Sequence, residues 1–340
     1  MKNSARTFIN KWDYDDLLDF FHLYSGISNY AKQTRIKLSS LADFNTRRLL
    51  AKQGANAHCL TAISNLGKTS AIGYLQSDFL LSKTTEKSVY FGRYFCNENM
   101  DIESATLMTK VIDDACLKIK PDICRIKCDN HLAVRESFID LGFEHYYSTI
   151  KFIHNHNLSQ HPNHTPTPDG IKVIASPSSF ILNTLLSHTT SERYHHPFLS
   201  NESLYKYYRI WWSDKLSNPN SVVFQAIDTN GDLLAFAVCS KPSYMQQIVN
   251  TPLYVLDFLY TYPAYRNKRI GMTFLQSIIQ KLSPAIIETS CSMHNKPITR
   301  LLEKCGFMKS ESYDFFAKNY SNDIPAKPYP TMPCCAREEK

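Results

Sequence analysis

The chain has 340 residues, of which 43% are hydrophobic and 20% are charged, and its formal net charge is +7. It can bury a full core, and its length favours two domains over one. No run approaches the roughly 18 apolar residues of a membrane span, and the N-terminal stretch turns acidic where a signal peptide needs an apolar core, so we expect a cytoplasmic protein. The basic residues form no clustered stripe, which argues against a nucleic-acid partner.

The first half contains a series of alternating strand and helix patterns. They predict strands at 58–64, 70–81 and 88–95, a helix over 103–120, a strand at 123–129, a helix over 131–140 and a strand at 143–152. We assign residues 1–152 to an N-terminal domain. Cys124 and Cys128 alternate on one of these strands, which is neither a zinc knuckle nor a disulfide framework, so we expect the cysteines to be reduced core thiols.

A polar segment at 153–169 lacks either hydrophobic period and is predicted to be a linker. Its four histidines are His154, His156, His161 and His164. A flexible segment without a fixed scaffold rarely selects a metal, so we expect no metal site. Residues 319–340 carry four prolines and are predicted to form a loosely held tail.

The second half, 170–318, is predicted to be a C-terminal domain with a clearer pattern. A strand at 170–176 and helices at 179–188 and 202–216 precede two strands around Asn230-Gly231, the strongest short hairpin pattern. A β-rich run at 252–262, a helix over 268–282, a strand at 285–293, a helix at 297–304 and a final strand or pair of strands at 307–318 follow.

The two halves resemble each other. Asn130 matches Asn295 and Gly142 matches Gly306 at separations that differ by one residue, and the order of elements agrees. We therefore predict a tandem repeat of one domain. The expected fold class is α/β, more narrowly α+β, with two domains that each contain a mixed, mostly antiparallel sheet flanked by helices.

The stretch YPAYRNKRIGMTF, 262–274, is predicted to bind an anion. A strand that leads through a short loop into a helix leaves backbone N–H groups exposed at the positive end of the helix dipole. Arg266 adds donors, Lys268 and Arg269 add charge, and Gly271 would let a diphosphate approach the backbone. The alternative is an ordinary basic helix start that faces solvent.

This stretch resembles motif A of the GNAT superfamily of acyl-CoA N-acyltransferases, whose loop reads Q/R-x-x-G-x-G/A. Arg266 falls on the first position, Arg269 replaces the first glycine and Gly271 is the last. The segment 294–307 resembles motif B in Asn295 and in its Gly-Phe ending. It departs from motif B at Ile298 and Leu302, where the family has alanine and tyrosine.

The resemblance implies acetyl-CoA as co-substrate, with no metal, and acetyl transfer to a primary amine in a ternary complex. The residues it places at the coenzyme are Leu259, Tyr260, Thr261, Arg266, Asn267, Lys268, Arg269, Ile270, Gly271, Met272 and Asn295. We expect Arg269 to be tolerated because it would already be helical and point outward. The first half has Glu98, Asp101 and Glu103 at the corresponding place, so we expect it not to bind the coenzyme.

The catalytic candidates lie on and after the β-rich run. The family implies an oxyanion donor at the amide of Tyr260 or Thr261, and alternation predicts that Asp257 shares a face with Thr261. Asp257 is the candidate base, although a structural ion pair is an equal alternative. Because Leu302 replaces the usual acid, Tyr260, His294, Tyr313 and water are candidates for the general acid.

The stretch 188–212 resembles the dTDP-fucosamine acetyltransferase branch of the family. It implies a nucleotide-linked amino sugar as the small-molecule acceptor, held by Arg193, Tyr194, His195 and His196. A peptide, polyamine or antibiotic amine is the alternative acceptor. A non-catalytic acyl-CoA-binding module and a homodimer also stay open.

Overall fold

The structure is a computed structural model that describes residues 6–9, 12–55, 57–63, 69–96, 102–156, 158, 171–176, 181–188, 196–242 and 248–321. The elements of the first half are β1 (Arg6–Ile9), α1 (Tyr14–Leu23), α2 (Ser25–Thr34), α3 (Leu38–Gly54), β2 (His58–Ile63), β3 (Thr69–Ser77), α4 (Phe79–Thr85), β4 (Val89–Cys96), α5 (Ile102–Ile119), β5 (Ile123–Asp129), α6 (Leu132–Asp140) and β6 (Glu144–Asn155).

The elements of the second half are β7 (Lys172–Ser176), α7 (Leu182–His188), α8 (Asn201–Ser217), β8 (Ser221–Ile227), β9 (Leu233–Ser240), β10 (Leu253–Thr261), the 3₁₀ turn η3 (Pro263–Tyr265), α9 (Ile270–Leu282), β11 (Ile286–Ser292), α10 (Lys296–Lys304) and β12 (Met308–Asn319). This order confirms the one predicted for the second half. The hairpin at Asn230-Gly231 is present, and Gly231 has a φ of +90°, which suits glycine.

All the strands of the described residues belong to one 12-stranded sheet in the order β1-β2-β3-β4-β5-β12-β6-β11-β10-β9-β8-β7. The pairs β4–β5 and β10–β11 are parallel, and the other pairs among the described strands are antiparallel. The predicted mixed α/β class is therefore confirmed. The sheet, however, is continuous across both halves of the chain.

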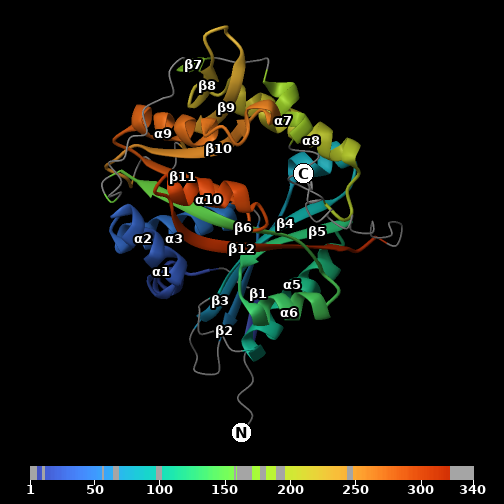
Figure 1. The fold of residues 1–340 in the computed structure, drawn as a ribbon. Helices are drawn as coiled ribbons and strands as arrows, with labels where there is room; N and C mark the ends of the chain where they lie inside the picture. Colours follow the sequence, from blue (N-terminus) through green and yellow to red (C-terminus); the bar gives the residue numbers. More distant parts are fainter. Residues whose placement is uncertain are drawn as a thin grey trace.

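The strand order indicates two repeats that have exchanged their final strands. In each half the fourth strand is followed by a helix, a strand, a helix and a final strand, and the sheet order is symmetric about its centre. The final strand of the first half, β6, pairs with β11, whereas the final strand of the second half, β12, pairs with β5. These two strands also pair with each other at the middle of the molecule (Figure 1).

A buried polar cluster holds the exchanged strand β12. The carboxylate of Asp314 is fully buried and accepts hydrogen bonds from Arg135 of α6 at 2.9 Å and from Ser148 of β6 at 2.6 Å. His145 of β6 lies 3.2 Å away. Burial alone would raise the pKa of Asp314, but the hydrogen bonds from His145, Ser148 and Arg135 hold it below its ordinary value.

The helices cover both faces of the sheet. On β6, Phe152 packs into the core under α9 and α10, while the next residue, Ile153, packs into the core under α1–α3. On β12, Phe316 packs under α5 and α6, and Ala317 lies in the core of α7 and α8. One face therefore carries α5, α6, α9 and α10, and the other carries α1–α4, α7 and α8 (Figure 1).

Several expectations need correction. Helices α1–α3 were not predicted, although Asp13 caps α1 by accepting from the N–H of Asp15 at 2.8 Å. Residues 79–81 belong to helix α4, not to a strand. Strand β6 continues through Ile153–Asn155, three residues assigned to the linker, because they pair with β11 and their side chains are buried. Most of the rest of the linker and all but the first residues of the tail lie outside the described residues.

The cysteines within the described ranges are free and buried, as predicted for core thiols. None of the described helices is both long enough and apolar enough to span a membrane. Among the same residues, no group of three His, Cys, Asp or Glu side chains is placed to hold a metal ion.

Candidate active site

The predicted anion loop lies between β10 and α9. Strand β10 ends at Thr261, the 3₁₀ turn η3 follows, and residues 266–269 lead into α9 at Ile270. The first helical hydrogen bonds of α9 are donated by Met272 and Thr273 to the carbonyl of Arg269, both at 3.1 Å. The N–H groups of Ile270 and Gly271 therefore lie at the open start of the helix, where an anion is favoured.

Arg269 does not have the backbone conformation that we expected. It is the N-cap residue of α9 with φ 61° and ψ 1°, which is left-handed and not helical. This is the region where glycine is least strained, so the arginine is tolerated at a conformational cost and not because it lies inside the helix. Asn267, two residues earlier, also has a positive φ of 62°.

Gly271 lies where the start of α9 closely approaches the end of β10. A Cβ at this position would lie 3.0 Å from the Thr261 hydroxyl oxygen, tighter than most real contacts of this kind. The first turn of α9 thus lies directly against the end of β10. An added side chain would have to displace Thr261 or the helix start.

The loop is strongly cationic and open to solvent. Arg266, Lys268 and Arg269 are all exposed. The Nε of Arg266 donates to the carbonyl of Thr261 at 3.1 Å, which directs this side chain along the strand end. The Lys268 ammonium lies 5.7 Å from the ring centre of Tyr265. A helix start with three exposed cations fits the diphosphate that coenzyme A carries.

Strands β10 and β11 separate next to this loop. They pair in parallel only from Leu253 to Val255, and beyond that point β10 pairs with β9 alone. The hydroxyl of Thr289 donates to the carbonyl of Leu256 at 2.8 Å where the ladder ends.

The separation leaves backbone donors on one side of β10. The N–H of Tyr262 donates to Leu234 of β9 at 3.1 Å. Because N–H directions alternate along an antiparallel strand, the N–H of Tyr260 also faces β9, while those of Leu259 and Thr261 face the side from which β11 has diverged. Of the two predicted oxyanion donors, Thr261 has the suitable direction.

The equivalent strands of the first half stay paired. Strands β4 and β5 form a parallel ladder over six residue pairs, from Val89 with Ile123 to Tyr94 with Cys128. At its end Arg93 forms an ion pair with Asp129 at 2.7 Å, and Asp129 also accepts from the N–H of Cys96 at 3.1 Å. These side chains occupy the position in the first half that corresponds to the separation of β10 and β11 in the second half. Glu103 lies in the first turn of α5, whereas Glu98 and Asp101 lie outside the described residues.

Asp257 is not on the face predicted for it. A β-bulge between Leu256 and Phe258 interrupts the alternation of β10. The carboxylate of Asp257 forms an ion pair with Lys215 of α8 and accepts from the Ser240 hydroxyl at 2.6 Å, and the side chain is 7% exposed. Thr261 lies on the other side, against α9. Sequence reasoning missed Lys215 and Ser240, because a helix partner cannot be inferred from alternation along a strand.

The other catalytic candidates are not gathered around Asp257. Tyr260 is buried in the core under α7 and α8, where Arg266 lies 5.5 Å from its ring centre. His294 is exposed in the turn after β11, and Asn295 caps α10 by accepting from Ile298 at 3.3 Å. Leu302, at the usual tyrosine position, is buried in the core.

Tyr313 lies elsewhere, against the first half. Its ring is 3.8 Å from the Lys127 ammonium, and its hydroxyl donates to Glu311. It therefore faces the side chains of β5 and not the separated strands β10 and β11.

The predicted acceptor residues are only partly described. Arg193, Tyr194 and His195 lie outside the described residues. His196 is buried, its Nδ1 accepts from the N–H of Phe198 at 3.2 Å, and its ring centre is 5.1 Å from that of Tyr146. On α8, Tyr208 and Trp212 are buried core residues.

Comparison with known proteins agrees with this geometry. Residues 185–307 match the acetyltransferase (GNAT) family model. No curated protein matches the chain significantly. A GCN5-related N-acetyltransferase from Sphaerobacter thermophilus is similar in structure, with a TM-score of 0.58 and 10% identity over 94% of this chain and 97% of that one. A tandem GNAT protein of the clavulanic acid biosynthesis pathway gives a TM-score of 0.48, with 10% identity over 95% and 100% of the two chains.

The helix-start loop and the separated strands both lie within residues 185–307, the segment that matches the GNAT family model. This segment is therefore similar to acetyltransferases of the GNAT family, whose co-substrate is acetyl-CoA. At 10% identity, the similarity to the Sphaerobacter protein shows a shared fold and nothing finer.

Proposed function

We propose that this protein transfers the acetyl group of acetyl-CoA to a primary amine, and that only its second half binds the coenzyme. The observation that carries the proposal is the contrast between the two halves. Strands β10 and β11 part beside a helix start with three exposed cations, whereas β4 and β5 stay paired and are closed by Arg93 and Asp129.

The residues present suit the coenzyme. Its diphosphate would meet the amides of Ile270 and Gly271 together with the side chains of Arg266, Lys268 and Arg269. A Cβ at Gly271 would be crowded by the Thr261 hydroxyl, since the helix start lies close to the strand end. The thioester arm would extend along β10, beside the amides that face away from β9.

The proposed reaction is a direct attack. The amine nitrogen forms a bond to the thioester carbonyl carbon, the carbon–sulfur bond breaks, coenzyme A leaves as its thiolate, and the amine loses a proton. The N–H of Thr261 would stabilise the oxyanion that develops on the carbonyl. Asp257 as base, Tyr260 or His294 as acid and Asn295 at the coenzyme stay hypotheses. The Lys215 ammonium and the Ser240 hydroxyl occupy the two carboxylate oxygens of Asp257, which supports a structural role for this side chain.

For the acceptor, we propose a nucleotide-linked amino sugar as the first candidate, on the resemblance of residues 188–212 alone. The proposal assigns the sugar to the face of α7 and α8, with Arg193 at its diphosphate. A panel of dTDP- and UDP-linked amino sugars, spermidine, lysine peptides and aminoglycosides, with thiol release as the readout, tests it. Turnover of a polyamine or peptide and of none of the nucleotide-sugars would reject this acceptor without affecting the proposed reaction.

Calorimetric titration with acetyl-CoA tests the coenzyme site. One site per chain is expected. Gly271→Glu should weaken binding at least about tenfold, close to 1.4 kcal/mol, because it places a carboxylate and a steric block at the helix start. Gly54→Glu is the matched control, since a Cβ there meets no atom within 4 Å. Two equivalent sites per chain, or unchanged binding by Gly271→Glu, would reject the proposal.

A further inference from the structure

A cavity of about 400 Å³ lies between helices α1–α3 and the middle of the sheet. Its side chains come from both halves of the chain: from α3, from β4 and β5, and from the strands β6, β11 and β12 near the centre of the sheet. Its size is within the usual range for small-molecule sites. It lies on the face opposite α9, so it is separate from the coenzyme loop.

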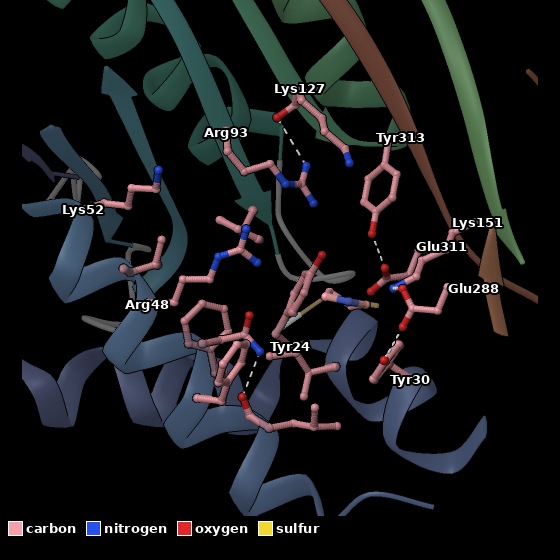
Figure 2. A pocket seen from close by; sticks show the side chains of 18 of the residues that line it. Tyr24, Tyr30, Arg48, Lys52, Arg93, Lys127, Lys151, Glu288, Glu311 and Tyr313 are labelled. Atoms are coloured by element: carbon pink, nitrogen blue, oxygen red, sulfur yellow. Dashed lines mark hydrogen bonds and ion pairs between the residues drawn. The ribbon is translucent and has the colours of Figure 1, made fainter. Parts of the chain in front are cut away.

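The cavity has an excess of positive charge. Five cationic and two acidic side chains line it. Arg48 and Lys52 reach in from α3, and Arg93 and Lys127 reach in from the sheet (Figure 2). Both acids have partners, because Glu288 binds Lys151 at 3.1 Å and the hydroxyl of Tyr30, and Glu311 accepts from Tyr313. Arg93 is paired in turn with Asp129 at 2.7 Å, and Glu311 keeps its charge near Lys127. The cationic side chains that line the cavity nevertheless outnumber the acidic ones.

Lys127 is the most unusual of these cations. Its ammonium lies 3.8 Å from the ring centre of Tyr313, and no described side chain forms an ion pair or hydrogen bond with it. Burial and the nearby guanidinium of Arg93 lower the pKa of Lys127 to about 7. A buried lysine without a counter-ion destabilises the folded protein. A bound anion would remove that cost.

Aromatic rings form much of the remaining wall. Tyr24 and Tyr74 are next to the cations of α3 and β4, and the Arg93 guanidinium lies 4.4 Å from the ring centre of Phe95 and 4.6 Å from that of Tyr313. Such surfaces pack against flat or apolar groups and hold the cations in fixed positions. The cavity thus combines rigid positive charge with apolar walls.

We infer that this cavity is a binding site for a small organic anion with two or more negative charges, held chiefly by Arg48, Lys52 and Lys127. Phosphate and carboxylate groups both provide this chemistry. The inference does not depend on acetyl transfer, since the coenzyme loop and this cavity lie on opposite faces of the sheet.

The site should respond to pH through Lys127. The charged groups that face it are Arg93 on β4, Asp129 on β5, Lys151 on β6, Glu288 on β11 and Glu311 on β12, with Arg48 and Lys52 on α3. An anion favours the protonated amine, so binding near pH 8 should take up as much as one proton, and affinity should fall as the pH rises above about 7.

The test is a titration of the full-length protein with citrate, inorganic pyrophosphate and uridine monophosphate, by calorimetry and thermal shift, with potassium chloride at matched ionic strength as the reference. At least one probe should bind one site per chain and raise Tm. Citrate and pyrophosphate separate the carboxylate and phosphate sources. Calorimetry in two buffers of different ionisation enthalpy measures the proton uptake.

Lys127→Met should reduce binding about tenfold or more and abolish the proton uptake. The variant should fold at least as well as the wild type, because it removes a buried charge, so lost binding cannot be ascribed to unfolding. Lys172→Met, at an exposed lysine of β7, is the matched control. Arg269→Ala reports any binding of the probe at the coenzyme loop. The inference is overturned if no probe binds at about 10 mM, if Lys127→Met binds as the wild type does, or if only Arg269→Ala weakens binding.

Discussion

Arg135 and Asp314 are 179 positions apart in the sequence, yet the guanidinium of one donates to the buried carboxylate of the other at 2.9 Å. Arg135 lies on α6 of the first half, and Asp314 lies on β12, the strand that the second half contributes beside β5. The pair therefore joins the two halves at the exchanged strand.

Arg135→Met should lower the free energy of unfolding by about 3 kcal/mol, because it leaves the Asp314 carboxylate in the core without its cationic partner. Chemical denaturation measures the change. Glu303→Gln, which breaks the half-exposed pair with Lys309, is the control and should cost less than about 1 kcal/mol. Equal effects of the two substitutions would contradict the role of the buried pair.

The exchanged strands predict that the halves depend on each other. A fragment of residues 170–340 lacks β6, which leaves β11 with an unpaired edge and β12 with neither of its neighbours. We expect this fragment to aggregate or stay unfolded alone, and to form a complex that binds acetyl-CoA when co-expressed with residues 1–169. A monomeric, cooperatively unfolding fragment that binds acetyl-CoA by itself would refute this expectation.

Because Arg269 has a left-handed conformation, we expect substitutions to glycine and to alanine to differ in stability but not in acetyl-CoA binding. Arg269→Gly should be about 1 kcal/mol more stable than Arg269→Ala, because glycine adopts a φ of 61° without strain. Both variants lose the same charge, so both should bind acetyl-CoA more weakly than the wild type and to a similar degree. Thermal denaturation and titration of the two variants provide the comparison, and equal stabilities would contradict the assigned strain.

The contacts of Asp257 predict a structural effect of its substitution. Asp257→Asn should destabilise the protein by about 2–4 kcal/mol, because the partly buried Lys215 loses its counter-ion. The double variant Asp257→Asn with Lys215→Met should recover much of the loss. The competing hypothesis, Asp257 as general base, requires kcat to fall about a hundredfold or more at temperatures where Asp257→Asn is fully folded, with unchanged acetyl-CoA affinity.

We expect the buried side chain of His154 to lower the free energy of unfolding at acidic pH. Its side chain is buried beside Phe307, and burial lowers its pKa to about 4. Between the ordinary histidine pKa and this value, the unfolded chain binds the proton that the folded chain excludes, so stability falls as the pH falls. The contribution of His154 should reach about 3 kcal/mol by pH 4.

His154→Leu should remove this part of the acid sensitivity, as measured by denaturation at several pH values between about 7 and 4. His294→Leu, at an exposed histidine, serves as the control. Parallel pH profiles for the wild type and His154→Leu would show that the buried imidazole is not responsible.

Local sequence patterns were sufficient to predict much of the secondary structure of the second half. The order of its elements, the hairpin at Asn230-Gly231 and the loop that leads into α9 were all predicted, because each depends on residues close together in the chain. The cationic loop before α9, with Gly271 in the first turn of the helix, depends only on the local backbone and a few neighbouring side chains. Gly142 and Gly306, matched as a repeat, both have a positive φ, 79° and 83°, after their helices.

The features that only the tertiary structure decided depend on distant partners. Strands β6 and β12 carry ordinary strand patterns, and which edge each one pairs with is settled by the packing of both halves together. The direction of Asp257 depends on a bulge against β9 and a lysine on α8. The cavity brings Arg48 and Lys127 together from a helix and a strand far apart in the chain, and the pKa of Lys127 follows from that burial, because the local sequence does not determine what surrounds an ammonium group in the folded protein.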